Sequence, residues 1–174
     1  MLSPAQLGDL IRDVPDFPKP GVVFKDITPL LADHRGLRSM AEHLCEPWLD
    51  AGVTLVAGVE ARGFLLAPLV AARLGVGMIP IRKPGKLPWE ATRKEYALEY
   101  GFDALEMHID AVGPADRVLI IDDVLATGGT AAAAVGLIHD VGGTVAGAAF
   151  VIELGFLDGR SALSNVVVTS VLRY

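Results

Sequence analysis

Apolar residues occur along the chain in short continuous runs that alternate with stretches of helical spacing. The continuous runs cover residues 53–59, 76–81, 117–121, 145–152 and 166–172. Runs of this length are typical of strands buried on both faces of a parallel sheet. Helical spacing, capping residues and glycine stops predict helices over residues 4–12, 36–50, 63–74 and 128–141. The alternation predicts an α/β fold, namely a doubly wound, mainly parallel sheet with flanking helices.

Two segments interrupt this alternation. Residues 15–21 contain three prolines and a glycine, which predicts irregular backbone. Residues 82–94 are polar and charged and contain two prolines and a glycine, which predicts a long mobile loop. Loops of this length in compact domains commonly act as lids over a site, and the alternative is a solvated polar loop. Residues 96–100 and 104–109 then predict a hairpin around Gly101.

Composition narrows the class of protein. The chain has 174 residues, of which 52% are hydrophobic, so we expect one folded domain over residues 1–174. The formal net charge is −6, so we expect no binding to nucleic acid. A single cysteine, Cys45, excludes an internal disulfide and favours a reducing compartment. The first residues lack the pattern of a signal peptide, and no apolar stretch reaches membrane-spanning length uninterrupted. We therefore expect a cytoplasmic protein with no membrane partner.

The segment that follows the run at 117–121 is the richest in chemistry. Two adjacent carboxylates, Asp122 and Asp123, precede a loop with two glycines and two threonines at the start of a predicted helix. Glycine lets the backbone approach a ligand closely, and the free N–H groups of a helix start favour an anion. Carboxylates beside an anion site suit sugar hydroxyls or a hydrated Mg²⁺. Their side chains point to opposite faces while the chain stays extended, so both can face a ligand only if the chain turns there. The alternative is a strand edge followed by a polar turn.

The stretch VLIIDDVLATGGT, residues 118–130, resembles the signature of the type I phosphoribosyltransferases, which bind phosphoribosyl pyrophosphate. Further segments resemble the members of that family that act on adenine, in the family's order and at its spacing. These segments are FPKPGVVFKDITPLL at 17–31, GVEARGF at 58–64, RKPGKLP at 82–88, YALEYG at 96–101 and IELGFLDGR at 152–160. The resemblance implies transfer of the phosphoribosyl group to adenine N9, which gives AMP and pyrophosphate in purine salvage. It also implies the type I phosphoribosyltransferase fold, with a small N-terminal hood over the base site and a mobile lid loop.

The resemblance also implies roles for individual residues. The 5′-phosphate would lie on Ala126, Thr127, Gly128, Gly129 and Thr130, and the ribose hydroxyls on Asp122 and Asp123. Pyrophosphate would meet Glu60, Ala61, Arg62 and Gly63, whose first peptide bond is often cis in the family, and the lid residues Arg82, Lys83 and Lys86. Adenine would meet Val23, Phe24, Lys25 and Leu154. Glu99, Arg62 and Lys86 are the implied catalytic residues, with Glu99 assisting proton transfer. Mg²⁺ would be held through the substrate and water near Asp122 and Asp123, with no direct protein ligand.

One position departs from the family pattern. The family often has arginine where Lys25 stands, and the two side chains are not equivalent where a planar fork is used. If that position reads adenine through its backbone, the change is mild. If the side chain reads the base, the change affects specificity.

Three further expectations accompany this interpretation. One alternative is transfer to another base, such as hypoxanthine or xanthine, which the segment around Phe24 would decide. A second is a regulator that keeps the fold but binds nucleotide or nucleic acid without turnover; the complete lid and pyrophosphate loop argue against it. The family also implies a homodimer whose small-molecule substrates are adenine and phosphoribosyl pyrophosphate.

Overall fold

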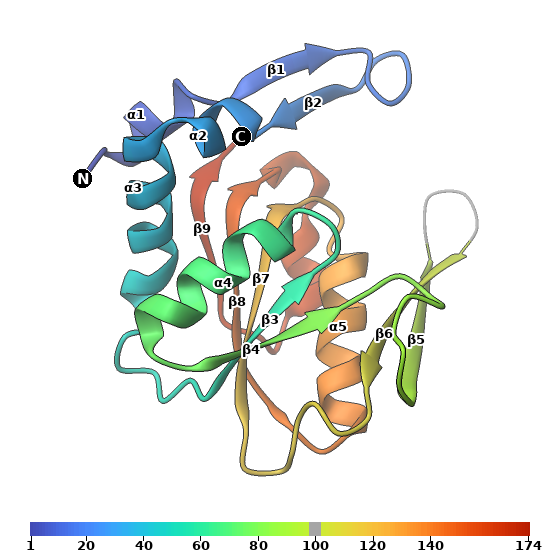
Figure 1. Cartoon of the computed structure of the whole chain (residues 1–174). Coiled ribbons are helices and arrows are strands. Elements are labelled where there is room, and N and C mark those ends of the chain that lie inside the picture. The colour runs from blue at the N-terminus through green and yellow to red at the C-terminus, as the bar shows by residue number, and fades with distance from the viewer. Residues whose placement is uncertain (98–101) are drawn as a thin grey trace.

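A five-stranded parallel sheet forms the centre of the computed structural model, which describes residues 1–97 and 102–174 (Figure 1). Its strands, in spatial order, are β4 (Gly77–Ile81), β3 (Leu55–Val59), β7 (Arg117–Leu125), β8 (Thr144–Glu153) and β9 (Val168–Arg173). Every neighbouring pair in this sheet is parallel. The doubly wound, mainly parallel sheet predicted from the apolar runs is thereby confirmed.

Helices cover both faces of the sheet. One face carries α1 (Pro4–Gly8), α2 (Thr28–Ala32), α3 (His34–Cys45), the short η1 (Glu46–Trp48) and α4 (Gly63–Leu74). The other face carries α5 (Gly129–Asp140). Two short helices, η2 (Gly155–Leu157) and η3 (Gly159–Leu163), follow the carboxyl end of β8. Along β7, Val118 and Ile120 pack in the cluster of α5, whereas Leu119 and Ile121 pack in the cluster of α4. This period of two explains why residues 118–121 are all apolar, since both faces of the strand are buried there.

A small antiparallel pair, β1 (Arg12–Pro15) and β2 (Val23–Asp26), crosses above the carboxyl ends of the sheet strands (Figure 1). We call this pair and the turn between its strands the hood. The helix predicted over 4–12 was too long, because α1 ends at Gly8 and Arg12 already begins β1. A helix this short has little stability of its own, so tertiary contacts decide where it ends. The peptide bond between Phe17 and Pro18, in the hood's turn, is cis.

A second antiparallel pair, β5 (Ala91–Ala97) and β6 (Phe102–His108), packs on α5. The predicted strand over 104–109 is confirmed by β6, whereas the predicted strand over 96–100 and Gly101 lie largely outside the described residues. The loop predicted over 82–94 is shorter, because β5 begins at Ala91. The half-buried positions of β5 are Thr92, Lys94 and Tyr96, so the strand alternation is present without an apolar signal.

No helix among residues 1–97 and 102–174 is long and apolar enough to cross a membrane.

Candidate active site

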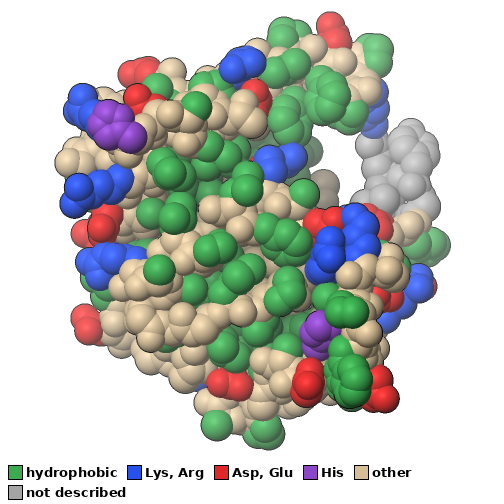
Figure 2. Space-filling model, viewed as in Figure 1, with side chains coloured by type: hydrophobic (Ala, Val, Ile, Leu, Met, Phe, Trp, Pro, Cys, Tyr) green, Lys and Arg blue, Asp and Glu red, His purple; other side chains and the backbone are tan. Residues whose placement is uncertain are grey.

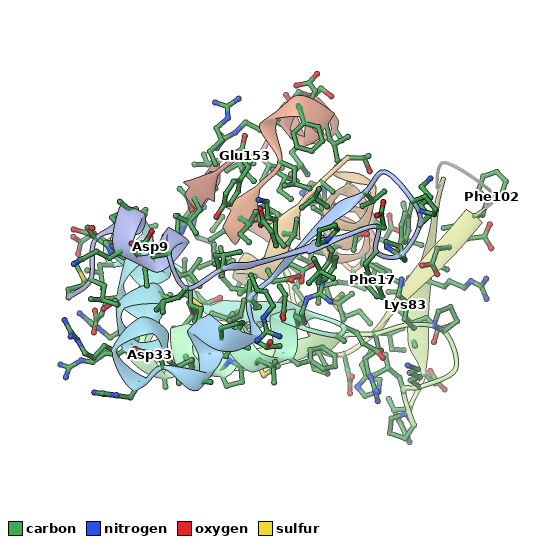
Figure 3. All side chains as sticks on the ribbon, turned by 90° about the horizontal axis from the view of Figure 1, so that it is seen from above. Asp9, Phe17, Asp33, Lys83, Phe102 and Glu153 are labelled. Atoms are coloured by element: carbon green, nitrogen blue, oxygen red, sulfur yellow. The ribbon has the colours of Figure 1, made fainter. Side chains whose placement is uncertain are left out.

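A cavity of about 400 Å³ lies at the carboxyl ends of the sheet strands, beneath the hood. Figure 3, seen from above, shows the hood with Phe17 crossing over the sheet and Glu153 to one side of it. Four groups of residues line the cavity: Val22, Val23, Phe24 and Lys25 of the hood; Glu60, Ala61 and Arg62; Lys83; and residues 122–131 with Phe150 and Leu154. Segments far apart in sequence meet here because parallel strands end at one edge of the sheet.

The loop before α5 forms the floor of one end of the cavity. Residues 126–130 all line it, and α5 begins at Gly129. Gly128 has φ +85°, a conformation that suits glycine, and a Cβ there would lie 2.3 Å from the carbonyl oxygen of Gly159. The first-turn N–H groups of α5 have no partner within the helix, so this end can hold an anion such as a phosphate.

The paired carboxylates both line the cavity. This differs from the expectation that the chain must turn at this point, because β7 continues to Leu125. The pairing of the neighbouring strand ends here: β3 pairs with β7 only as far as Ile121, so the edge of β7 on that side is not paired with β3 at Asp122 and Asp123. Asp123 is 4% exposed and accepts a hydrogen bond from Nε of Arg62. Burial and the adjacent charge of Asp123 raise the pKa of Asp122 well above its ordinary value.

The segment between β3 and α4 supplies a basic side chain, Arg62, to the cavity. The peptide bond between Glu60 and Ala61 is cis, as in the family pattern. Arg62 lines the cavity, and its guanidinium carbon lies 5.1 Å from the centroid of the Phe24 ring. Gly63 does not line the cavity; it is the buried first residue of α4, and a Cβ there would lie 2.6 Å from the carbonyl oxygen of Ile121. Its lack of a side chain lets α4 start close to β7.

The lid residues converge on Glu60. Its carboxylate accepts a hydrogen bond of 2.9 Å from the backbone N–H of Lys83, lies 3.4 Å from Nε of Arg82 and pairs with the ammonium of Lys86. Burial alone would raise the pKa of Glu60, but these basic partners outweigh it and lower that pKa. Lys83 lines the cavity, whereas Arg82 and Lys86 do not. Of the three predicted lid cations, Lys83 therefore lines the cavity, and Arg82 and Lys86 lie next to it through their contacts with Glu60.

Two large apolar side chains also line the cavity. Phe24 comes from the hood and Leu154 from the end of β8, and both line the cavity. The rings of Phe24 and Phe17 meet edge to face, with centroids 5.2 Å apart. An aromatic ring and an aliphatic side chain in one cavity suit a planar heterocycle that stacks on the ring.

Sequence reasoning omitted five lining residues: Val22, Val124, Leu125, Ala131 and Phe150. The first four are neighbours of residues that were predicted. Phe150 pairs in register with Asp122, which places it beside the cavity. Because it lies within the continuous apolar run of β8, nothing in the sequence distinguishes it from its buried apolar neighbours. Glu99, the residue expected to assist proton transfer, lies outside the described residues.

Comparison with known proteins supports a common origin for this arrangement. The model of the phosphoribosyl transferase domain family matches residues 26–166. An adenine phosphoribosyltransferase of Nitrosococcus oceani is 56% identical over 164 residues, which are 94% of this chain and 96% of the relative. The crystal structure of an adenine phosphoribosyltransferase from Thermoanaerobacter pseudethanolicus superposes with a TM-score of 0.97 at 46% identity, covering 99% of this chain and 100% of that one.

The adenine phosphoribosyltransferase of Saccharomyces cerevisiae, complexed with adenine and an imino-altritol bisphosphate, superposes with a TM-score of 0.92 at 37% identity, covering 97% of this chain and 98% of that one. The likeness thus spans almost the whole chain, including the hood, the loop before α5 and the segment around Leu154. The chain belongs to the phosphoribosyltransferase family, and within it to the adenine phosphoribosyltransferases.

Proposed function

We propose that this chain transfers the phosphoribosyl group of phosphoribosyl pyrophosphate to N9 of adenine, which forms AMP and releases pyrophosphate. The observation that carries the proposal is one cavity with a helix start for a phosphate at one end and a Phe24–Leu154 slot for a base at the other. Two carboxylates and an arginine lie between them, where ribose and pyrophosphate would join. In this proposal, residues 1–174 act as one phosphoribosyltransferase domain.

Each group of residues has a separate task in the reaction. The loop at 126–130 holds the 5′-phosphate, and Asp122 and Asp123 accept hydrogen bonds from the ribose hydroxyls. Arg62 and Lys83 neutralise the charge that develops on pyrophosphate as its bond to ribose C1 breaks. The transition state resembles an oxocarbenium ion, by analogy with other glycosyl transfers. The walls of the slot fix the base with N9 facing C1 and exclude water.

The lid completes the neutralisation of the leaving group. Arg82 and Lys86 lie beside Glu60, next to Ala61 and Arg62 of the cavity wall. A pyrophosphate bound at Arg62 competes with the Glu60 carboxylate for these cations. We therefore assign them, with Glu60, Ala61 and Gly63, to the pyrophosphate side of the site, and Glu99 to the handling of the N9 proton.

The donor set at the carboxylates fits Mg²⁺ that arrives with the substrate. Among residues 1–97 and 102–174 no cluster of three or more acidic, histidine or cysteine side chains could hold a metal ion. Asp122 and Asp123 would instead hold it indirectly, by accepting hydrogen bonds from its water ligands. Bound there, Mg²⁺ supplies Lewis-acid stabilisation of the leaving pyrophosphate.

The test is turnover by the purified protein with phosphoribosyl pyrophosphate and Mg²⁺, following nucleotide and pyrophosphate on adenine, hypoxanthine and guanine. We expect AMP formation that requires Mg²⁺, a preference for adenine and a sharp loss of rate in Asp123→Asn. A preference for an oxopurine would mean that the base is not adenine, and it would leave the proposed phosphate site unchanged. Absence of turnover with every base would support the regulator.

We further propose that the protein acts in the cytoplasm as a homodimer. The outward side of α4 carries Leu65, Pro68, Leu69 and Ala72 at helical spacing, and Leu65 is 54% exposed. Figure 2 shows hydrophobic side chains across this face of the molecule. An apolar face of this kind on a helix indicates a partner surface.

Sedimentation velocity tests the dimer. We expect the wild type to sediment at the mass of two chains, and Leu65→Glu to shift it toward one chain because it places a charge in the apolar contact. Val167→Glu is the matched control, because Val167 is also an exposed apolar residue, at 63% exposure, away from α4. A monomeric wild type at micromolar concentration contradicts the proposal.

A further inference from the structure

Tyr174 lies against the hood and contacts a residue of the base slot. The ammonium of Lys25 lies 4.0 Å from the centroid of the Tyr174 ring. The same ammonium donates a 2.6 Å hydrogen bond to Oδ1 of Asp13, directly across the β1–β2 pair. The Lys25 side chain is 14% exposed and Tyr174 is 41% exposed, so the contact is partly withdrawn from water, which strengthens a cation–π interaction relative to a fully exposed one.

The direction of the Lys25 side chain follows from its neighbour. Successive residues of a strand point to opposite faces, and Phe24 and Lys25 are successive residues of β2. Phe24 packs beneath the guanidinium of Arg62, at the cavity. Lys25 therefore contributes backbone to the base slot, while its ammonium is held by Asp13 and Tyr174.

The backbone of Tyr174 holds the opposite wall of the slot. Its N–H donates to the carbonyl of Glu153 at 2.9 Å, and its carbonyl accepts from the N–H of Gly155 at 2.8 Å. Both bonds flank Leu154, the residue that closes the slot. Figure 1 shows the C-terminal end of β9 directly below the hood. One residue thus touches both walls, through its ring on one side and its backbone on the other.

The hood depends on such contacts for its order. A two-stranded antiparallel pair is marginally stable alone in water and needs packing against other elements. The position of Phe24 over the cavity is therefore set by whatever fixes β2 to the rest of the fold. The ion pair of Lys25 with Asp13 lies within the hood, so the Tyr174 ring is the partner of Lys25 that ties it to the sheet.

We infer that Tyr174 is a positioning residue for the base slot, which fixes the distance between Phe24 and Leu154 by holding Lys25 with its ring and Leu154 with its backbone. The inference rests on the proposed adenine transfer. It predicts that the ring matters for the affinity of the base and not for that of phosphoribosyl pyrophosphate, whose anion sites lie on Arg62 and at the start of α5.

The experiment compares Tyr174→Leu with Tyr174→Phe in the full chain. Tyr174→Leu is expected to raise KM for adenine about five- to tenfold, between the scales of an exposed and a desolvated cation–π contact, and to leave KM for phosphoribosyl pyrophosphate and kcat within about twofold. Tyr174→Phe keeps the ring and the backbone and is expected to keep the wild-type KM for adenine. Lys25→Met is expected to raise KM for adenine similarly, with no further rise in the Lys25→Met/Tyr174→Leu double variant.

Hydrogen exchange gives a readout that does not depend on turnover. The amides of residues 23–26 are expected to exchange faster in Tyr174→Leu than in the wild type, and at the wild-type rate in Tyr174→Phe. If the wild type makes AMP but Tyr174→Leu leaves both KM for adenine and this exchange unchanged, the inference is overturned. If KM values for both substrates rise together, Tyr174 has a general structural role and the inference is likewise overturned. A wild type that forms no AMP rejects the proposed function, and the exchange rates then decide the anchoring of the hood by themselves.

Discussion

Gly128→Ala is expected to lower kcat/KM for phosphoribosyl pyrophosphate about a thousandfold and to destabilise the fold by about 3 kcal/mol, because backbone strain and a steric clash coincide. The residue has φ +85° at the start of α5, where a side chain is strained. A Cβ would also lie 2.3 Å from the carbonyl oxygen of Gly159 and 2.8 Å from Cβ of Ala162. Neither contact is the end of a flexible side chain, so the loop itself must move. Its N–H groups would then leave the geometry that holds a phosphate.

The measurement combines initial rates over a range of phosphoribosyl pyrophosphate concentrations with denaturant unfolding. Gly113→Ala is the matched control, because a Cβ there meets the carboxylate of Asp116 at an ordinary 3.6 Å. The reciprocal change Gly159→Ala should reproduce the loss, since its Cβ would lie 2.2 Å from the carbonyl oxygen of Ala126. Wild-type rates in Gly128→Ala would show that the loop before α5 does not hold the phosphate.

The part of the cavity lined by residues 122–131 was predictable because its residues are consecutive. A buried strand, two carboxylates, a glycine pair and a helix start follow one another between 117 and 130, and each feature has a local physical meaning. The sheet was predictable for the same reason, since strands buried on both faces leave unbroken apolar runs. Helix α4 was also placed correctly at Gly63–Leu74, although Pro68 lies inside it.

Contacts between segments that are distant in the sequence produce no local sequence pattern from which they could be predicted. The need for glycine at Gly159 comes from Ala126, which lies on another element. Its neighbour Arg160 binds the buried Glu153 through two hydrogen bonds of 2.8 and 2.7 Å, which help to lower the pKa of Glu153 to about 2. The contact between Lys25 and Tyr174 joins residues of β2 and of the segment after β9, which lie far apart in the sequence. Such pairs depend on topology, and a single sequence does not encode them locally.

Asp122→Asn is expected to make the protein more stable at neutral pH and about 50-fold less active, because a charged hydrogen-bond acceptor for the ribose is lost. Burial, and then the charge of Asp123, raise the pKa of Asp122 well above its ordinary value of 3.8. The ionised side chain is therefore unfavourable in the folded state. The backbone N–H of Asp123 donates to Oδ1 of Asp122 at 2.9 Å, and an asparagine can accept the same bond without the charge.

The sign of the pH dependence follows from the raised pKa. Because the folded protein binds this proton more tightly than the unfolded chain, the favourable contribution is fully present below pH 3.8 and is lost as pH rises through the folded-state pKa. Asparagine stays neutral throughout. The unfolding free energy of Asp122→Asn should therefore match that of the wild type in acid and exceed it increasingly as pH rises.

Urea unfolding at a series of pH values, with rates measured on the same preparations, tests both halves of this expectation. Asp110→Asn, which removes an exposed carboxylate away from the cavity, serves as the control on the same pH series. A wild type more stable than Asp122→Asn at neutral pH would mean that the carboxylate is stabilised in the empty site. Lower activity together with higher stability would instead mean that the site keeps a buried carboxylate, at a cost to folding, for contact with the ribose.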